Sequence, residues 1–200
     1  MSLLAGWLAA YLIGAIPTSY LVSRHVAGID LRTRGSGNLG ATNVYRVLGW
    51  RYAVPVGVFD IAKGAAPVLL LPPRMGDAAW IPLTVGAAAI VGHVYSVFVK
   101  FQGGKGVATA AGVVLALAPL AVAVCAVLWV MLVWATGYVS VASLVGAIVF
   151  PLVAWFTTGG DAWLVSAGVL LAAFIVFNHR ANLRRLLAGT ESRFRRGQAS

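Results

Sequence analysis

Residues 106–160, GVATAAGVVLALAPLAVAVCAVLWVMLVWATGYVSVASLVGAIVFPLVAWFTTGG, contain no charged side chain. One helix of these 55 residues would be about 80 Å long at a rise of about 1.5 Å per residue, whereas the hydrocarbon core of a bilayer is about 30 Å thick. The stretch therefore predicts several membrane-spanning helices. The expected breaks are Pro119, Gly137 and residues 157–160, because proline and glycine interrupt helices.

The composition of the whole chain agrees with a membrane protein. Of its 200 residues, 60% are hydrophobic and 10% are charged, and the formal net charge is +10. Soluble globular domains contain about 45–50% apolar and about 25% charged residues. These values exclude a disordered chain and an ordinary soluble enzyme. The single cysteine, Cys125, excludes an internal disulfide and a cysteine zinc cluster.

Four further apolar runs complete the set of predicted helices. They cover residues 3–23, 52–71, 78–99 and 162–179. The first run is expected to remain as a helix, because a cleaved signal peptide begins with basic residues and residues 1–4 contain none.

The basic residues predict which helix ends face the cytoplasm. Three segments hold 13 of the 15 lysines and arginines, namely residues 24–51, 100–105 and 180–200. The positive-inside rule places all three in the cytoplasm. An even number of crossings must then separate the second segment from the third. The last two predicted helices, residues 139–157 and 162–179, supply two crossings, so residues 106–136 supply two or none.

We therefore expect an all-α integral membrane protein with seven transmembrane helices, its N-terminus outside and its C-terminus in the cytoplasm. Residues 106–118 and 119–136 then form two spans, the first short or tilted. The alternative has five spans and a re-entrant segment over residues 106–136. We expect a single transmembrane domain over residues 1–200, with a basic tail at about 192–200 that could be disordered.

The first polar segment on the predicted cytoplasmic side is glycine-rich. Residues 34–43 read RGSGNLGATN, and Arg46 follows. Thr42 or Asn43 could cap a short helix that carries this arginine. Glycine turns before a helix present N–H groups that suit an anion. The alternative is a flexible loop in which the glycines only turn the chain.

The second polar segment, residues 101–109, reads FQGGKGVAT and opens an apolar helix. The helix dipole, the glycine N–H groups and Lys105 would point at one small volume, which predicts phosphate binding. It is not a Walker A motif, because Gly106 stands where that motif has serine or threonine. The alternative is a tight turn whose lysine only sets the topology.

The third polar segment, residues 178–191, reads NHRANLRRLLAGTE. Helical spacing places His179, Asn182 and Arg185 on one face, and Gly189 is a plausible helix C-cap. The alternative is the end of an interfacial helix whose arginines bind anionic lipid.

Several polar residues lie inside the predicted spans, near the same side. Asp60 and Lys63 are three residues apart on one helix and can pair, and His93 lies close to the end of the next. Ionisable groups at this depth are costly and mark functional sites, although a structural salt bridge and a packing histidine are the alternatives. Ser140 and Ser143 also lie near the inner face, and the alternative for them is that they bond their own backbone, as serines in apolar helices usually do.

These segments together predict one site on the cytoplasmic face, rich in cations, backbone donors, serine, asparagine and histidine. Such a site suits phosphate groups held at the membrane surface. It contains no carboxylate or cysteine cluster, so we expect neither a metal nor a cofactor. The basic balance also needs no nucleic-acid partner, because topology and phosphate binding account for it.

The three segments together resemble the three motifs of the bacterial acyl-phosphate:glycerol-3-phosphate acyltransferases (PlsY). Asp60, Lys63, Gly64 and His93 also match, and the matches extend from Ile16 to Glu191. The resemblance implies a seven-helix membrane protein of the bacterial inner membrane, with its active site on the cytoplasmic face. It implies transfer of a fatty acyl group from acyl phosphate to the 1-hydroxyl of sn-glycerol 3-phosphate, the first acylation of phospholipid synthesis. The products are lysophosphatidic acid and inorganic phosphate.

The resemblance also implies the site residues. The expected catalytic residues are Ser36, Lys105, His179 and Asn182. The expected phosphate-binding residues are Gly37, Asn38, Gly40, Thr42, Asn43, Arg46, Gly103, Gly104, Gly106, Ser143 and Arg185. The expected supporting residues are Asp60, Lys63, His93 and Glu191. Glu191 either orients His179 or an arginine, or simply terminates the motif.

The route of the reaction stays open at two points. The proton of the acceptor hydroxyl passes either to His179, the side chain best suited to general base work near neutral pH, or to a substrate phosphate. Direct transfer is preferred to an acyl-enzyme on Ser36, because no acid–histidine relay accompanies that serine.

Overall fold

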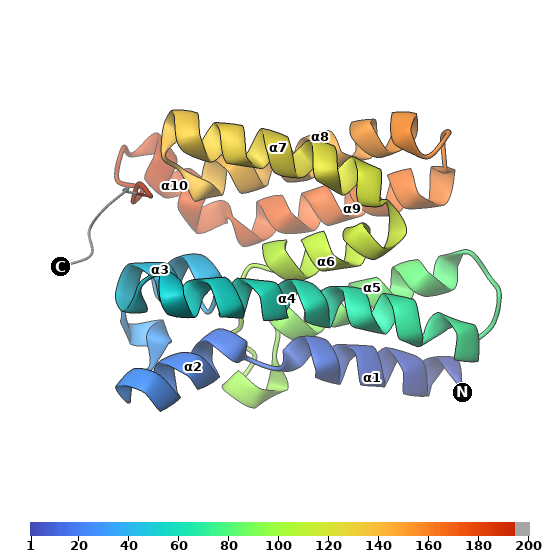
Figure 1. The fold of residues 1–200 in the computed structure, drawn as a ribbon, viewed down its shortest axis with the longest axis horizontal. Coiled ribbons are helices and arrows are strands. Elements are labelled where there is room, and N and C mark those ends of the chain that lie inside the picture. Colours follow the sequence, from blue (N-terminus) through green and yellow to red (C-terminus); the bar gives the residue numbers. More distant parts are fainter. Residues whose placement is uncertain (195–200) are drawn as a thin grey trace. The chain divides into compact units, whose positions relative to one another are not determined.

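The computed structural model describes residues 1–194, and every regular element within them is a helix (Figure 1). The α-helices are α1 (Leu3–Ala15), α2 (Thr18–Ala27), α3 (Ala41–Leu48), α4 (Trp50–Leu70), α5 (Trp80–Val94), α6 (Val107–Leu117), α7 (Pro119–Thr136), α8 (Val139–Thr157), α9 (Ala162–Asn178) and α10 (Arg180–Leu187). Three short 3-10 helices, Leu31–Thr33, Pro72–Arg74 and Val97–Val99, lie between them. The expected basic tail falls outside the described residues from 195 onward.

The chain forms two compact units, one made of Met1–Leu117 and one that begins at Ala118. In the first unit, α1 packs along α5, and α4 packs along α6 and α3. The crossing of α4 and α6 depends on Gly64 and Gly112. A Cβ atom on Gly64 would lie 2.1 Å from the carbonyl oxygen of Thr109, and one on Gly112 would lie 1.9 Å from that of Ile61. Small residues allow this close approach of two backbones, as is common between membrane helices.

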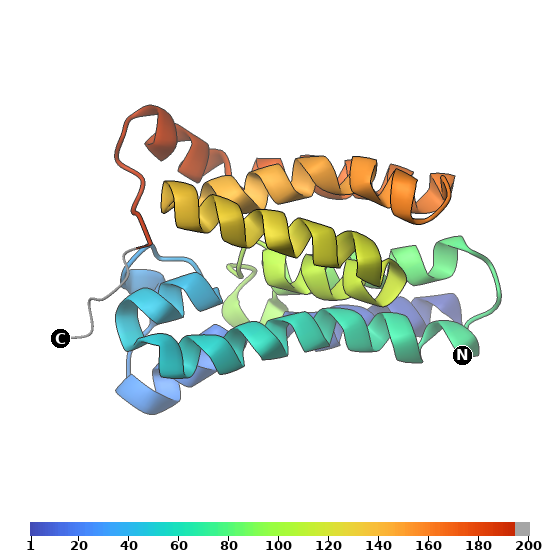
Figure 2. The ribbon, with the colours of Figure 1, turned by 45° about the horizontal axis from the view of Figure 1, so that its top comes forward.

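In the second unit, α7 packs along α8, and α8 along α9 (Figure 2). The predicted breaks are confirmed. Pro119 begins α7, Gly137 ends it with a φ of 75°, and α8 ends at Thr157. Asp161 starts α9, because its carboxylate accepts the N–H of Leu164 at 3.1 Å. The last helix, α10, is bent by 59° from α9.

The first predicted helix differs from the expectation. Residues 3–23 were expected to form one helix, but α1 ends at Ala15 and α2 runs from Thr18 to Ala27. Pro17 lies at the break, where it has no N–H to donate and disfavours the helical conformation at Ile16. Ile16 accordingly has a ψ of 113°.

Among the described residues, five helical segments are long and apolar enough to cross a bilayer, namely Leu3–Ala27, Trp50–Arg74, Trp80–Val99, Pro119–Thr136 and Val139–Thr157. The bent pair of α9 and α10 makes a sixth when it is counted as one span. The remaining apolar helix, α6, has 11 residues. Many large apolar side chains on these helices are exposed, among them Leu4, Val58, Trp134 and Leu170. Such surfaces fit an integral membrane protein with lipid around its helices.

Candidate active site

One buried side chain, Asn43, holds the first polar loop in shape. Its Nδ2 donates to three loop carbonyls at 3.0–3.3 Å, those of Leu31, Arg34 and Asn38. Its Oδ1 accepts the N–H of Ser36 at 2.8 Å. The loop lies on a buried apolar cluster that includes Leu31, Leu39, Val44 and Val56. The side chain of Ser36 is exposed, on a loop whose backbone is held in place by the hydrogen bonds of Asn43.

This use of Asn43 differs from both sequence expectations for it. Neither Thr42 nor Asn43 caps the short helix α3, which follows Gly40 and has no side-chain cap. The helix itself forms as expected and carries Arg46. The amide of Asn43 bonds the loop instead of standing open to a ligand, because the loop turns back over the first turn of α3.

The second polar segment is a tight reversal of the chain after α5. Lys100 and Phe101 both have positive φ, 56° and 61°, a conformation that costs free energy for residues with a side chain. The reversal brings the N–H of Gly103 to the carbonyl of Val94 at 2.9 Å and that of Gly104 to the carbonyl of His93 at 3.2 Å. These two N–H groups, expected to bind phosphate, therefore donate to protein carbonyls. Lys105 follows at the N-terminus of α6, where the first four N–H groups have no partner within the helix.

The two glycine-rich segments lie against each other at Gly104. A Cβ atom on this residue would lie 2.2 Å from Nε2 of His93 and 2.6 Å from the carbonyl oxygen of Leu39. Only glycine fits between these two groups. The loop that carries Ser36 and the turn that carries Lys105 are thus neighbouring parts of the first unit.

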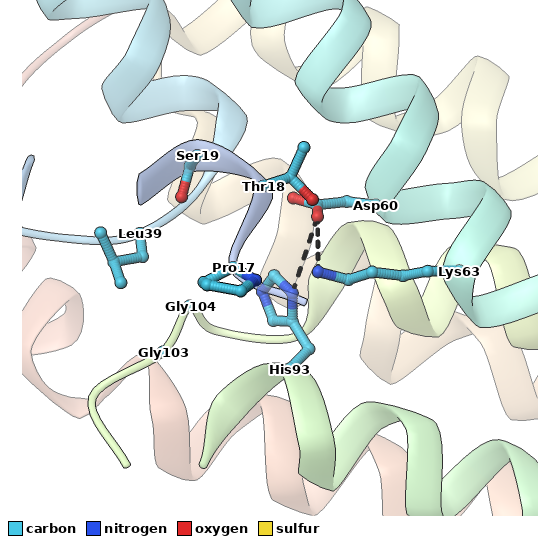
Figure 3. Close-up of a pocket in the computed structure, with 9 residues that line it drawn as sticks. All are labelled: Pro17, Thr18, Ser19, Leu39, Asp60, Lys63, His93, Gly103 and Gly104. Carbon is cyan, nitrogen blue, oxygen red and sulfur yellow. Dashed lines mark ion pairs between the residues drawn. The ribbon is translucent and has the colours of Figure 1, made fainter. Parts of the chain in front are cut away.

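A buried cluster of three ionisable side chains lies beneath this turn (Figure 3). Nζ of Lys63 is 2.7 Å from Oδ1 of Asp60, and Nδ1 of His93 is 3.9 Å from the same oxygen. Lys63 also donates to the carbonyl of Ile16 at 2.8 Å, at the break between α1 and α2. The predicted pairing of Asp60 with Lys63 is confirmed, and it involves a third group and a backbone carbonyl.

In the second unit, Glu191 is the shared partner of the third polar segment. Its Oε1 accepts from Nδ2 of Asn182 at 2.5 Å and from the hydroxyl of Ser140 at 2.8 Å. Its Oε2 accepts from Nε of Arg185 at 2.7 Å. Burial raises the pKa of Glu191, but the hydrogen bonds from Asn182, Arg185 and Ser140 outweigh burial and leave the pKa below the ordinary value of 4.5. The carboxylate is therefore ionised at neutral pH and bonds an arginine, Arg185, which is one of the alternatives expected for it.

His179 stands at the bend between α9 and α10 and is buried. Its Nδ1 lies 2.8 Å from the carbonyl of Ile175. A carbonyl oxygen only accepts, so Nδ1 carries the hydrogen, and Nε2 of the neutral ring is the basic nitrogen. This is the tautomer that a general base acting through Nε2 requires.

The two serines of α8 bond side chains distant in sequence rather than their own backbone, which was the alternative for them. Ser140 donates to Glu191, and the hydroxyl of Ser143 accepts Nε1–H of Trp129 at 3.2 Å. Ser143 therefore links α7 to α8. Both partners are distant in sequence, so a local rule does not predict them.

The structure thus groups the predicted site residues by unit. Ser36, Lys105 and the cluster around Asp60 belong to the first, and His179, Asn182, Arg185 and Glu191 to the second. Sequence reasoning missed the carbonyl of Ile16, although the proline after it was a readable signal. Within residues 1–194, no three His, Cys, Asp or Glu side chains lie close enough together to hold a metal ion.

Comparison with known proteins identifies the family of the chain. Residues 4–189 match the family model described as glycerol-3-phosphate acyltransferase. The chain belongs to the glycerol-3-phosphate acyltransferase family. Among named members, it is 50% identical over 191 residues to that of Desulforudis audaxviator, covering 92% of each chain. It is 46% identical over 190 residues to that of Syntrophotalea carbinolica, covering 94% of this chain and 95% of the other.

Solved structures of a family member agree with the fold. The glycerol 3-phosphate form of PlsY, an integral membrane glycerol 3-phosphate acyltransferase, matches with a TM-score of 0.89 and 39% identity over 96% of each chain. The lysophosphatidic acid form matches with a TM-score of 0.85 and 37% identity, over 96% of this chain and 94% of the other. The resemblance to this acyltransferase family noted in the three motifs is confirmed.

Proposed function

We propose that the protein transfers a fatty acyl group from acyl phosphate to the 1-hydroxyl of sn-glycerol 3-phosphate. The products are lysophosphatidic acid and inorganic phosphate, and the reaction is the first acylation of phospholipid synthesis. The observation that carries this proposal is the match over 96% of the chain to a relative described in a glycerol 3-phosphate form. A second form of that relative, with lysophosphatidic acid, corresponds to the product.

The cations that the three motifs supply have a common task in this proposal. Each substrate carries a phosphate, so two anions must approach each other during the reaction. Lys105, Arg46 and Arg185 offset this repulsion, while the N-terminal N–H groups of α6, beginning at Gly106, add a positive helix end. Ser36 and Asn182 position the substrates by hydrogen bonds.

The glycines and polar residues of the first loop have a supporting part. Gly37, Asn38, Gly40 and Thr42 are assigned to the binding of a substrate phosphate together with Arg46. Asn43 shapes this loop, since its amide is already bonded to the loop backbone. Gly103 and Gly104 likewise shape the second turn, and Ser143 holds α7 against α8.

The chemical step is a direct transfer in this proposal. The 1-hydroxyl oxygen of glycerol 3-phosphate bonds to the acyl carbon, the bond from that carbon to the phosphate oxygen breaks, and phosphate leaves with the electron pair. The hydroxyl proton passes to Nε2 of His179 or to a substrate phosphate. The tautomer of His179, with its hydrogen on Nδ1 toward Ile175, supports the first route.

We also propose a topology of seven transmembrane helices in a bacterial inner membrane, with the N-terminus outside and the C-terminus and active site on the cytoplasmic side. The protein then acts as one transmembrane domain over its length. The distribution of the basic residues supports this topology, and α6 is its shortest span, at 11 residues. The alternative keeps five spans and a re-entrant segment at 106–136.

The deciding assay supplies the purified protein with palmitoyl phosphate and labelled glycerol 3-phosphate. We expect labelled lysophosphatidic acid, and we expect Lys105→Ala to lower the rate by about 100-fold or more, because the loss of one donor to a developing charge typically costs that much. Lys100→Asn is the matched control, since it removes a nearby lysine from a positive-φ position that asparagine tolerates. Activity with acyl-CoA but not with palmitoyl phosphate would refute the donor assignment.

The base is tested by comparing His179→Ala and His179→Gln across pH. If His179 takes the proton, both variants lose rate and lose the ionisation that limits the wild-type enzyme at low pH. A pH profile and rate close to wild type in both variants would assign the proton to a substrate phosphate. Trapping an acyl group on Ser36 would refute direct transfer.

A further inference from the structure

The cluster of Asp60, Lys63 and His93 lies where ionisable groups are costly. The side chains of Asp60 and Lys63 are each 2% exposed, on α4, a helix long and apolar enough to cross a bilayer. A buried ion pair is weak evidence for stability, because the loss of hydration can exceed the attraction between the charges. The pair therefore calls for a role other than holding α4 in the fold.

The cavity beside the cluster is too small for a substrate. Its volume is about 10 Å³, which is room for about one water molecule, whereas small-molecule pockets measure about 300 Å³ or more. Its walls come from the α1–α2 break, the first polar loop and the second turn, with Thr18, Leu39 and Gly104 among them. The cavity beside the three side chains therefore has no room for glycerol 3-phosphate.

The contacts of the cluster lead to the turn before Lys105. Figure 3 shows His93 between the pair and Gly104. The ring of His93 lies against Gly104, and its carbonyl accepts the N–H of that residue. On the other side, Lys63 bonds the carbonyl of Ile16. One charged cluster therefore links the α1–α2 break to the turn that places Lys105.

We propose that Asp60, Lys63 and His93 are positioning residues that fix the turn at Gly103 and Gly104, and so set the affinity of the Lys105 site for substrate phosphate. The inference rests on the proposed acyl transfer. It assigns these residues an effect on substrate binding that reaches the substrate through the backbone of the turn. It also assigns the ion pair to the geometry of the site rather than to stability.

The test removes both charges while keeping the side-chain volumes close to native, in the double variant Asp60→Asn/Lys63→Met. We expect the KM for glycerol 3-phosphate to rise by between about 10-fold and 100-fold, because a displacement of about 1 Å in a binding group has effects of this size. We expect kcat to fall by a smaller factor than KM rises, because Lys105 keeps its charge and His179 is untouched. The thermal midpoint in detergent should stay close to that of the wild type, because the lost attraction and the relieved burial oppose each other.

Ser96→Ala is the matched control. Ser96 is buried and donates to the carbonyl of Ala15 at 2.5 Å, one residue before the carbonyl that Lys63 bonds, but it does not line the cavity. The KM of the Ser96→Ala variant should stay within about twofold of wild type, because this substitution removes no contact of Gly103 or Gly104. An equal rise in KM in Ser96→Ala would overturn the inference. Any loosening of the end of α1 would then be enough to raise KM, and the charged cluster would have no specific effect.

Two further variants keep the test decisive. Lys63→Arg retains the charge and should keep most of the wild-type affinity that the double variant loses. His93→Gln removes the ring that lies on Gly104 and should raise KM. This second result can be measured even if the double variant does not fold. A normal KM in both the double variant and His93→Gln, in an enzyme whose wild type is active, refutes the positioning role. An inactive wild type would instead refute the proposed function.

Discussion

Single residues in this protein have a larger effect on the geometry of the site than on its charge. A side chain on Gly104 would meet both the ring of His93 and the carbonyl of Leu39, and Glu191 accepts hydrogen bonds from Ser140, Asn182 and Arg185. Neither residue needs to touch a substrate to be required for activity. Both can be tested with changes of one or a few atoms.

Replacing Gly104 by alanine should impair both folding and activity. The new Cβ would lie 2.6 Å from a backbone oxygen, which cannot move aside as a side chain can. Overpacking of this kind costs about 1–3 kcal/mol, so we expect a lower thermal midpoint together with a loss of acyl transfer. Gly146→Ala is the control, because nothing lies within 4 Å of that position on α8. Equal behaviour of the two variants would contradict the close packing at Gly104.

Replacing Glu191 by glutamine should lower stability at neutral pH by about 1–3 kcal/mol, as expected when charge-assisted hydrogen bonds are weakened. The pKa of Glu191 in the folded protein lies below 4.5, so its stabilising contribution is complete above pH 4.5 and is lost as the pH falls through the lowered pKa. Thermal midpoints of both proteins measured against pH should therefore converge in acid. A gap that stays constant below pH 4.5 would rule out ionisation of Glu191 as the cause.

At the scale of helices, close crossings bring the functional segments together. The crossing of α4 with α6 joins the helix that carries Asp60 and Lys63 to the helix that begins after Lys105. Its closeness depends on Gly64 and Gly112, where there is no space for a side chain. The distance between these helices therefore affects the candidate site as well as the fold.

Gly112→Ala should push α4 and α6 apart, because its Cβ would lie 1.9 Å from the carbonyl oxygen of Ile61. We expect a fall in the thermal midpoint and in the rate of acyl transfer. Gly57→Ala on α4 is the matched control, since its Cβ would meet only the Cβ of Ala41 at an ordinary 3.5 Å. Wild-type stability and rate in Gly112→Ala would show that the crossing tolerates more space than the structure indicates.

The elements also show which features can be read from the sequence. Pro119 and Gly137 act on their own neighbours, so the ends of α7 were predictable from local rules. The pairing of Asp60 with Lys63 was predictable for the same reason, as both lie on one helix. The bond from Lys63 to Ile16 joins residues 47 positions apart, and the turn glycines donate to carbonyls of another segment. Such contacts depend on the packed fold, and the apolar run 3–23 concealed the break that creates one of them.

For the whole molecule, labelling from outside distinguishes two membrane crossings by residues 106–136 from a re-entrant segment. The seven-span topology brings the junction of α6 and α7 to the outer surface, whereas a re-entrant segment returns it to the cytoplasmic side. We expect a membrane-impermeant maleimide added outside to label Leu120→Cys in a Cys125→Ser background, because Leu120 is exposed and follows this junction. Gly159→Cys should be labelled as well and Thr190→Cys should not. Labelling of Gly159→Cys without Leu120→Cys would favour the re-entrant alternative.

The position of Glu191 has a consequence for biosynthesis. It follows all ten α-helices of the described chain, yet it is the common partner of Ser140 on α8 and of Asn182 and Arg185 on α10. A nascent chain that has already inserted these helices still lacks this partner until residue 191 leaves the ribosome. The third motif is thus organised last, so a polypeptide stalled before that point would lack the carboxylate that bonds Ser140, Asn182 and Arg185.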